Sequence, residues 1–167
     1  MVNRWILVLS VMIAAGCTEK VVGPPGNANV QSVFLTFSTR QAEHASNFAS
    51  QQYIIPAITP TVVDHGAVLA YARLEGTWTA LPYTFAYESA DVPLVDYAVM
   101  FGYAYDYQLL DLFLDASSVD PAVWAAIDED FGEPLTVKVV VIDGYPPPSQ
   151  LDLGSYEEVA AYYNLAI

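Results

Sequence analysis

The chain has 167 residues, of which 54% are apolar, and it carries 19 acidic against 5 basic side chains, a formal net charge of −14. This charge argues against nucleic acid as a partner, because proteins gain affinity for phosphates by neutralising them with Lys and Arg. It also argues against a polybasic membrane patch. The acidity keeps an apolar-rich chain in solution, or it adapts the chain to a salty environment that screens the self-repulsion.

The first 16 residues have the pattern of a secretory signal peptide. Arg4 supplies a positive start, residues 5–15 form an apolar run broken only by Ser10, and small residues occupy the end of the segment. The run is shorter than the roughly 20 apolar residues that a membrane-spanning helix requires. We therefore expect residues 1–16 to direct export and to be removed.

Cys17, the only cysteine of the chain, directly follows this segment. The string AAGC at residues 14–17 resembles the lipobox of bacterial lipoproteins. This resemblance implies that Cys17 carries a diacylglycerol and, usually, an amide-linked acyl chain, and that it becomes the mature N-terminus. A lone cysteine in an exported protein otherwise needs a special reason. The alternative is an ordinary signal peptide followed by an incidental cysteine.

The residue after the cysteine bears on location. Thr18 stands where many lipoproteins retained in the inner membrane have Asp. The resemblance thus implies the outer membrane, with the domain either in the periplasm or exposed at the surface. Residues 17–29 form the lipidated cysteine and a spacer that contains the turn-forming string GPPG. Because residues 18–29 show no apolar periodicity, we expect an extended, mobile tether there and one folded domain over residues 30–167.

Several short apolar segments predict strands in the first half of this domain. VQSVFLTFS, which begins at Val30, alternates apolar and polar residues as a strand does. QQYIIPAI is a second run, in which Pro56 favours an edge or a bulge. TPTVVDHG predicts one helical turn that Thr59 caps and Gly66 ends. AVLAYARLEG and WTALPYTFAY then predict a strand pair joined at Glu75-Gly76.

Residues 95–114 are nearly free of strand-breaking residues and rich in aromatic side chains. The bulky side chains stand at alternate positions, which a strand gathers on one face and a helix scatters around its circumference. We expect two strands that turn near Tyr105 to Tyr107. An exposed tyrosine row suits sugar or protein surfaces, so the candidate ligand contacts are Tyr97, Tyr103, Tyr105 and Tyr107. The alternative is that these rings face the core or a neighbouring strand.

Two helices and one strand complete the outline. SVDPAVWAAIDEDFG predicts a helix that Asp120 caps and Gly132 ends. LTVKVVVIDG predicts a β-branched strand that ends at Gly144. In SYEEVAAYYNL, Ser155 and Glu158 have the spacing of a capping box at the start of a helix.

These elements predict a mainly β fold, a single antiparallel β-sandwich or partly open barrel with two short peripheral helices. The order of GPPGNANV, YIIPAITPTVVDHGAVLAYARLEGTWTALPYTF, VKVVVIDG and SYEEVAAYYNL resembles a family of uncharacterised bacterial lipoproteins. That family has a collagen-like Gly-Pro spacer and a C-terminal β domain. The resemblance implies this architecture and an envelope location, and it implies no activity. A collagen triple helix needs Gly at every third position over many repeats, whereas this chain has a single GPPG unit.

Catalytic and metal-binding motifs are not recognisable in the sequence. Its two histidines are His44, in the polar stretch RQAEHASN, and His65, at the predicted end of a helical turn. We expect a solvated loop position for His44 and a helix-capping role for His65. DEDFGE at residues 128–133 lacks the order of an EF-hand loop, so we expect a solvated acidic face there and not a calcium site. No metal and no cofactor are expected.

The sequence thus predicts a cell-envelope lipoprotein that is held at the membrane through Cys17 and carries a non-catalytic binding or display domain. The expected partner is a polysaccharide or an envelope protein. The alternative is a hydrolase of envelope or extracellular polymers, which would need two acids at a fixed separation in a cleft. With nineteen acidic residues, the sequence nominates no such pair.

Overall fold

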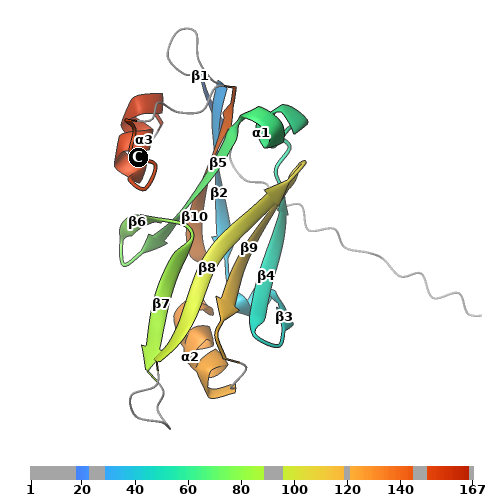
Figure 1. Cartoon of the computed structure of the whole chain (residues 1–167), viewed down its shortest axis with the longest axis vertical. Helices are drawn as coiled ribbons and strands as arrows, with labels where there is room; N and C mark the ends of the chain where they lie inside the picture. The colour runs from blue at the N-terminus through green and yellow to red at the C-terminus, as the bar shows by residue number, and fades with distance from the viewer. Residues whose placement is uncertain (1–17, 23–28, 89–95, 119–120, 145–149, 166–167) are drawn as a thin grey trace, which may run out of the picture.

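The computed structural model describes residues 18–22, 29–88, 96–118, 121–144 and 150–165, and Figure 1 draws the remaining residues in grey. The fold is mainly β, as predicted, and consists of two five-stranded antiparallel sheets. Sheet A has the order β1 (Thr18–Val22), β2 (Asn29–Phe37), β10 (Leu135–Asp143), β5 (Ala67–Leu74) and β6 (Thr77–Ala80). Sheet B has the order β3 (Glu43–Ala45), β4 (Phe48–Ile54), β9 (Leu109–Ala116), β8 (Asp96–Asp106) and β7 (Tyr83–Glu88).

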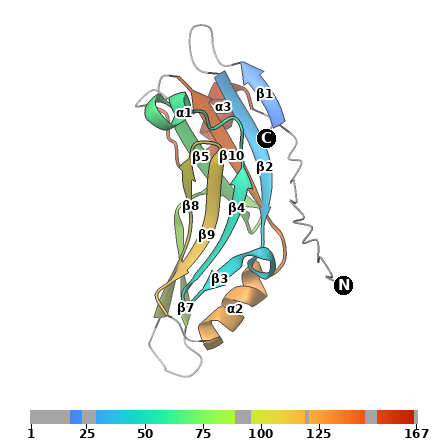
Figure 2. The same ribbon diagram turned by 90° about the vertical axis from the view of Figure 1, so that its right-hand side faces the viewer.

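The two sheets form the layers of a sandwich, seen edge-on in Figure 2. Its core is filled by alternate residues along the strands of both sheets, because successive side chains of a strand point to opposite faces. In β2 these are Val33, Leu35 and Phe37, while Phe34 between them faces outward. The alternation that the sequence predicts for this strand is therefore confirmed.

Three α-helices among the described residues lie at the periphery. α1 (Pro60–His65) and α2 (Pro121–Phe131) sit at opposite ends of the sandwich (Figures 1 and 2). The Thr59 side chain accepts a hydrogen bond of 3.2 Å from the Val62 backbone N–H, which confirms it as the cap of α1. The predicted Asp120 cap of α2 lies outside the described residues. From α2, Phe131 packs edge-on against Phe85 and Phe101 of sheet B.

α3 (Tyr156–Tyr163) covers the outer face of sheet A and forms a second, smaller core there. Ser155 caps the helix by accepting a 3.2 Å hydrogen bond from the Glu158 N–H. In a capping box the Glu158 carboxylate would accept a hydrogen bond from the Ser155 backbone N–H. Here it accepts one from the Asp152 backbone N–H instead, at 3.3 Å, so this half of the prediction is wrong. Strand β10 is consequently buried on both faces, between sheet B and α3, which explains its run of β-branched residues.

The hairpins follow the predicted turn chemistry. Glu75 and Gly76 link β5 to β6 with φ angles of 48° and 85°, the left-handed backbone that a two-residue hairpin turn requires. β8 and β9 turn at residues 107–108, where Gln108 has φ 59°. Both turns lie where the sequence predicts a reversal or within one residue of it.

Three features differ from the sequence expectations. Residues 18–22, expected to belong to a free tether, form β1 and pair with β2 from Thr18↔Val33 to Val22↔Asn29. The stretch around His44, expected to be a loop, forms the short edge strand β3. The expected single strand WTALPYTFAY is split, because the chain crosses from sheet A to sheet B at Leu81-Pro82 and Pro82 has no N–H to continue the ladder.

Candidate functional site

The four candidate tyrosines do not form one surface. Tyr97 and Tyr103 are partly buried against the core between the sheets. The Tyr103 hydroxyl donates a 2.8 Å hydrogen bond to the Val68 carbonyl of sheet A. Burial, with a smaller contribution from neighbouring Tyr105, raises the pKa of Tyr103. Tyr103 thus links sheet B to sheet A through one hydrogen bond.

The other two candidate tyrosines are exposed. Tyr105 is 38% exposed and Tyr107, in the β8–β9 turn, is 51% exposed. The Tyr105 ring lies 6.4 Å from the Tyr103 ring at an interplanar angle of 17°. The predicted row is therefore divided, with a structural half inside the sandwich and an accessible half at its rim.

The two outer faces of the sandwich are unlike. α3 packs over the outer face of sheet A, whereas no described helix lies over the outer face of sheet B in either view (Figures 1 and 2). The side chains that sequence reasoning missed are on this second face. They recur at every second position, as Phe48, Ser50 and Gln52 on β4 and as Asp111 and Phe113 on β9.

Aromatic rings form one side of a hollow on this face. Phe48 and Phe113 stack with their centroids 5.3 Å apart and an interplanar angle of 25°. Phe113 pairs with Gly102 of β8, and a Cβ at Gly102 would stand only 2.7 Å from the Phe113 Cζ atom. Because Gly102 has no side chain, the Phe113 ring can lie directly over the β8 backbone.

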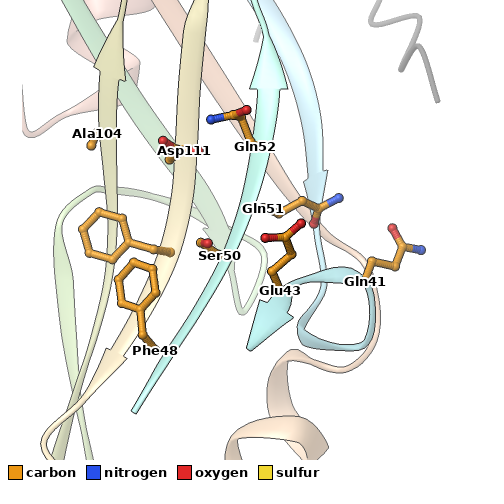
Figure 3. A pocket seen from close by; sticks show the side chains of 9 residues that line it. Gln41, Glu43, Phe48, Ser50, Gln51, Gln52, Ala104 and Asp111 are labelled. Carbon is orange, nitrogen blue, oxygen red and sulfur yellow. The ribbon is translucent and has the colours of Figure 1, made fainter. Parts of the chain in front are cut away.

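Polar side chains line the rest of the hollow, which has a volume of about 600 Å³. Figure 3 shows Ser50 and Gln52 of β4 beside Asp111 of β9, with Glu43 of β3 and Gln41 toward one side. Gln52 is the direct cross-strand partner of Asp111, and Ser50 is the partner of both Glu43 and Phe113. The lining combines hydroxyl, amide and carboxylate groups and contains no Lys, Arg or His.

The histidines do not contribute to this hollow. His44 Nε2 lies 2.8 Å from the Thr39 carbonyl oxygen, and its ring stands edge-on to Trp124. His44 is exposed, as expected, but it is a hydrogen-bonded strand residue and not part of a loop. His65 is the last residue of α1, at the opposite end of the sandwich from β3 (Figure 2). The two imidazoles are therefore not brought together.

The acidic stretch 128–133 forms the end of α2 and the residues after it. Its Glu133 pairs with Arg40 at 2.5 Å, an exposed ion pair. Across the described part of the chain, no group of three or more His, Cys, Asp or Glu side chains is arranged to hold a metal ion. Nor does that part contain a helix with the length and apolarity to cross a membrane.

A buried lysine on sheet A was also missed. Lys138 of β10 is 0% exposed, and its Nζ atom lies 4.7 Å from the Phe34 ring centroid and 4.8 Å from that of Tyr156. It also donates a hydrogen bond to the Tyr156 hydroxyl. This group joins α3 to the sheet and is closed to solvent, so it offers no binding surface.

No protein family, no curated protein and no solved structure matches this chain.

Proposed function

We propose that the protein is a cell-envelope lipoprotein, anchored in the outer membrane by acyl chains on Cys17, whose sandwich domain binds a ligand on the outer face of sheet B. The observation that supports a binding role is the asymmetry of the two outer faces. One is partly covered by α3, and the other holds the hollow with the Phe48–Phe113 pair and a polar lining. The anchor is supported by the AAGC string after an apolar run.

The position of the hollow suits binding. Its main side chains come from adjacent strands of one sheet, whose register is set by backbone pairing from Phe48↔Asp115 to Ile54↔Leu109. The pairing fixes the backbone positions that carry these side chains before a ligand arrives, which lowers the cost of ordering the site on binding. A hydrolase is the second candidate class, and in this hollow it would have to use Asp111 and Glu43 as its acid and base.

Acylation is tested on the full chain expressed in a bacterium. We expect intact-mass analysis of the detergent-extracted protein to give a chain that begins at Cys17 and carries acyl groups, and Cys17→Ser to leave the chain unprocessed. A native chain that begins at any other residue would contradict the anchor.

Binding is tested with cell-envelope fragments as the probe and the acylated protein in detergent. We expect Phe113→Ala to be retained about tenfold less than the unchanged protein, a loss of about 1.4 kcal/mol. Both proteins carry the same anchor, so the anchor cannot cause the difference. Equal retention would overturn the binding role of this face. Release of soluble fragments that Asp111→Asn abolishes would favour the hydrolase.

A further inference from the structure

We propose that the hollow on sheet B binds an uncharged, hydroxyl-rich glycan chain. This inference rests on the proposed function and names the ligand class for the same face. It follows from three properties of the lining: a flat aromatic surface, planar hydrogen-bonding side chains beside it, and the sign of its charges.

The aromatic surface is provided by Phe113 together with Phe48. Because Gly102 has no Cβ atom, the far end of the Phe113 ring lies close against the sheet at this position. Both rings are only partly buried, and their offset stacking extends the apolar area. A pyranose ring has one face made of C–H groups, and this face packs against an aromatic ring while the hydroxyl groups point outward from the rim.

The polar side chains are placed to meet such hydroxyl groups. Gln52 and Asp111 are cross-strand partners, two positions along the strands from the pair Ser50 and Phe113 and therefore on the same face of the sheet. An amide offers donors and an acceptor, a serine hydroxyl offers both, and a carboxylate accepts. Neighbouring sugar hydroxyls act as donor and acceptor in turn, so this mixture matches them. A purely apolar partner would leave these groups without hydrogen bonds where they become buried, which is unfavourable.

The charges select against acidic polymers. The lining contains Glu43 and Asp111 and no basic side chain, and the chain as a whole has a formal net charge of −14. Phosphate-bearing and uronate-bearing polymers would therefore be repelled. The four uncharged polar residues of the lining outnumber the two carboxylates, which favours a neutral ligand over a cationic one. They are Gln41, Ser50, Gln51 and Gln52.

The test is native electrophoresis of the acylated protein through gels that contain one soluble polysaccharide, in a detergent without a sugar headgroup. The probes are a neutral glucan, a neutral galactomannan, alginate as the anionic polymer and chitosan as the cationic one. We expect at least one neutral polymer to slow the protein and alginate to have no effect. Phe113→Ala and Gln52→Ala should each weaken this retardation about tenfold.

Ile54→Ala is the matched control. Ile54 is 70% exposed on the outer face of β4 but does not line the hollow, so its removal should leave the retardation unchanged. If Phe113→Ala fails to fold, Gln52→Ala still tests the hollow, because Gln52 is exposed. No retardation by either neutral polymer, retardation only by chitosan that disappears in salt, or equal retardation of all variants would overturn the inference.

A second arm separates this inference from the proposed function. Cell-envelope fragments are treated either with protease or with periodate, which cleaves the vicinal diols of sugars. We expect retention on the fragments to survive protease and to be lost after periodate. Retention that depends on Phe113 but is lost after protease would overturn the glycan and leave a binding face for an envelope protein. No dependence on Phe113 with any fragment would overturn both.

Discussion

Lys138 illustrates how a single residue can join two layers of the molecule. It lies on the outer face of β10, cross-strand from Phe34 on one side and from Tyr71 on the other. α3 closes over it with Tyr156, whose ring stacks at a tilt on Tyr71 with centroids 5.2 Å apart. Burying an amine is costly unless its environment compensates, and here two aromatic rings and the Tyr156 hydroxyl surround it. The lysine therefore helps to hold α3 against sheet A.

We predict that Lys138→Ala lowers the free energy of unfolding by about 2–4 kcal/mol, because a desolvated contact between a cation and aromatic rings is worth about 2 kcal/mol or more and the packing of the lysine stem is lost as well. Arg73→Ala is the control. The Arg73 guanidinium lies 5.8 Å from the Trp78 ring centroid on the same face, but Arg73 is exposed. Its removal should cost only about 0.5–1 kcal/mol. Equal costs in urea unfolding would show that Lys138 is not a structural link.

Tyrosines that are removed from solvent make the stability of the fold depend on pH in the alkaline range. Burial raises the pKa of Tyr53, Tyr71, Tyr103 and Tyr163. Each is therefore still protonated in the folded protein at a pH where an unfolded tyrosine, with a pKa of about 10, ionises. Between these two pKa values the folded state binds more protons than the unfolded state, so stability falls as pH rises.

We therefore predict that these tyrosines leave the free energy of unfolding nearly unchanged from about pH 7 to 9 and lower it above about pH 10. Tyr103→Phe should cost about 1 kcal/mol at neutral pH, since it removes the hydrogen bond to the Val68 carbonyl. The gap between variant and unchanged protein should narrow by pH 11, because the variant has no hydroxyl to ionise there. A gap that stays constant in urea titrations across this range would contradict the assignment.

At the scale of elements, the sequence predicted the helix caps and the hairpin turn, because these features depend on residues that are close together along the chain. The Thr59 and Ser155 caps and the Glu75-Gly76 turn are set by side chains within three or four positions along the chain, and all are present. The pairing of β1 with β2 and the position of the chain crossing at Pro82 depend on residues distant in sequence, and neither was predicted.

The hollow was missed for a related reason. The density of aromatic residues in β8 favoured its tyrosines as candidates, yet Tyr97 and Tyr103 pack against the core between the sheets. The residues of the hollow are sparse along the chain, since Phe48 and Phe113 are 65 positions apart. Strand register brings them together. The only local signal of the hollow was the alternation of residue types along β4 and β9. That alternation does not show which face of the sheet stays open to solvent.

Gly102 gives a prediction at this scale. In Gly102→Ala the new Cβ would meet the Phe113 ring at 2.7 Å, so the ring must tilt away from the sheet. The contact is with the far end of a side chain, and Ala is favoured over Gly within a strand by roughly 0.5–1 kcal/mol. We expect the free energy of unfolding to change by less than about 1 kcal/mol, while retention on the neutral polysaccharide falls. A stable variant with unchanged retention would show that the orientation of Phe113 is unimportant.

At the scale of the whole molecule, β1 changes the relation between anchor and domain. Thr18 is already paired with Val33, so an acylated Cys17 would precede the edge strand of sheet A by one residue. The sandwich would then lie close to the bilayer surface, without the twelve-residue tether that the sequence indicated. Sheet A would be next to the membrane along this edge, while the hollow belongs to the other sheet.

This arrangement is tested by comparing a chain that begins at residue 18 with one that begins at residue 29. Loss of β1 removes five paired positions from β2 and leaves the backbone of Asn29–Val33 as an open sheet edge. Each lost backbone hydrogen bond costs about 0.5–1.5 kcal/mol net, so we expect the shorter chain to be less stable by about 2 kcal/mol or more. For a domain of this size that lowers Tm by about 4–8 °C.

Size-exclusion chromatography should also show that the shorter chain self-associates, because Phe34, which is 42% exposed, lies on the strand whose edge is opened. Equal Tm values and equal elution would instead mean that residues 18–22 contribute nothing to the fold, and the anchor would then be joined to the domain through a spacer, as the sequence alone indicates.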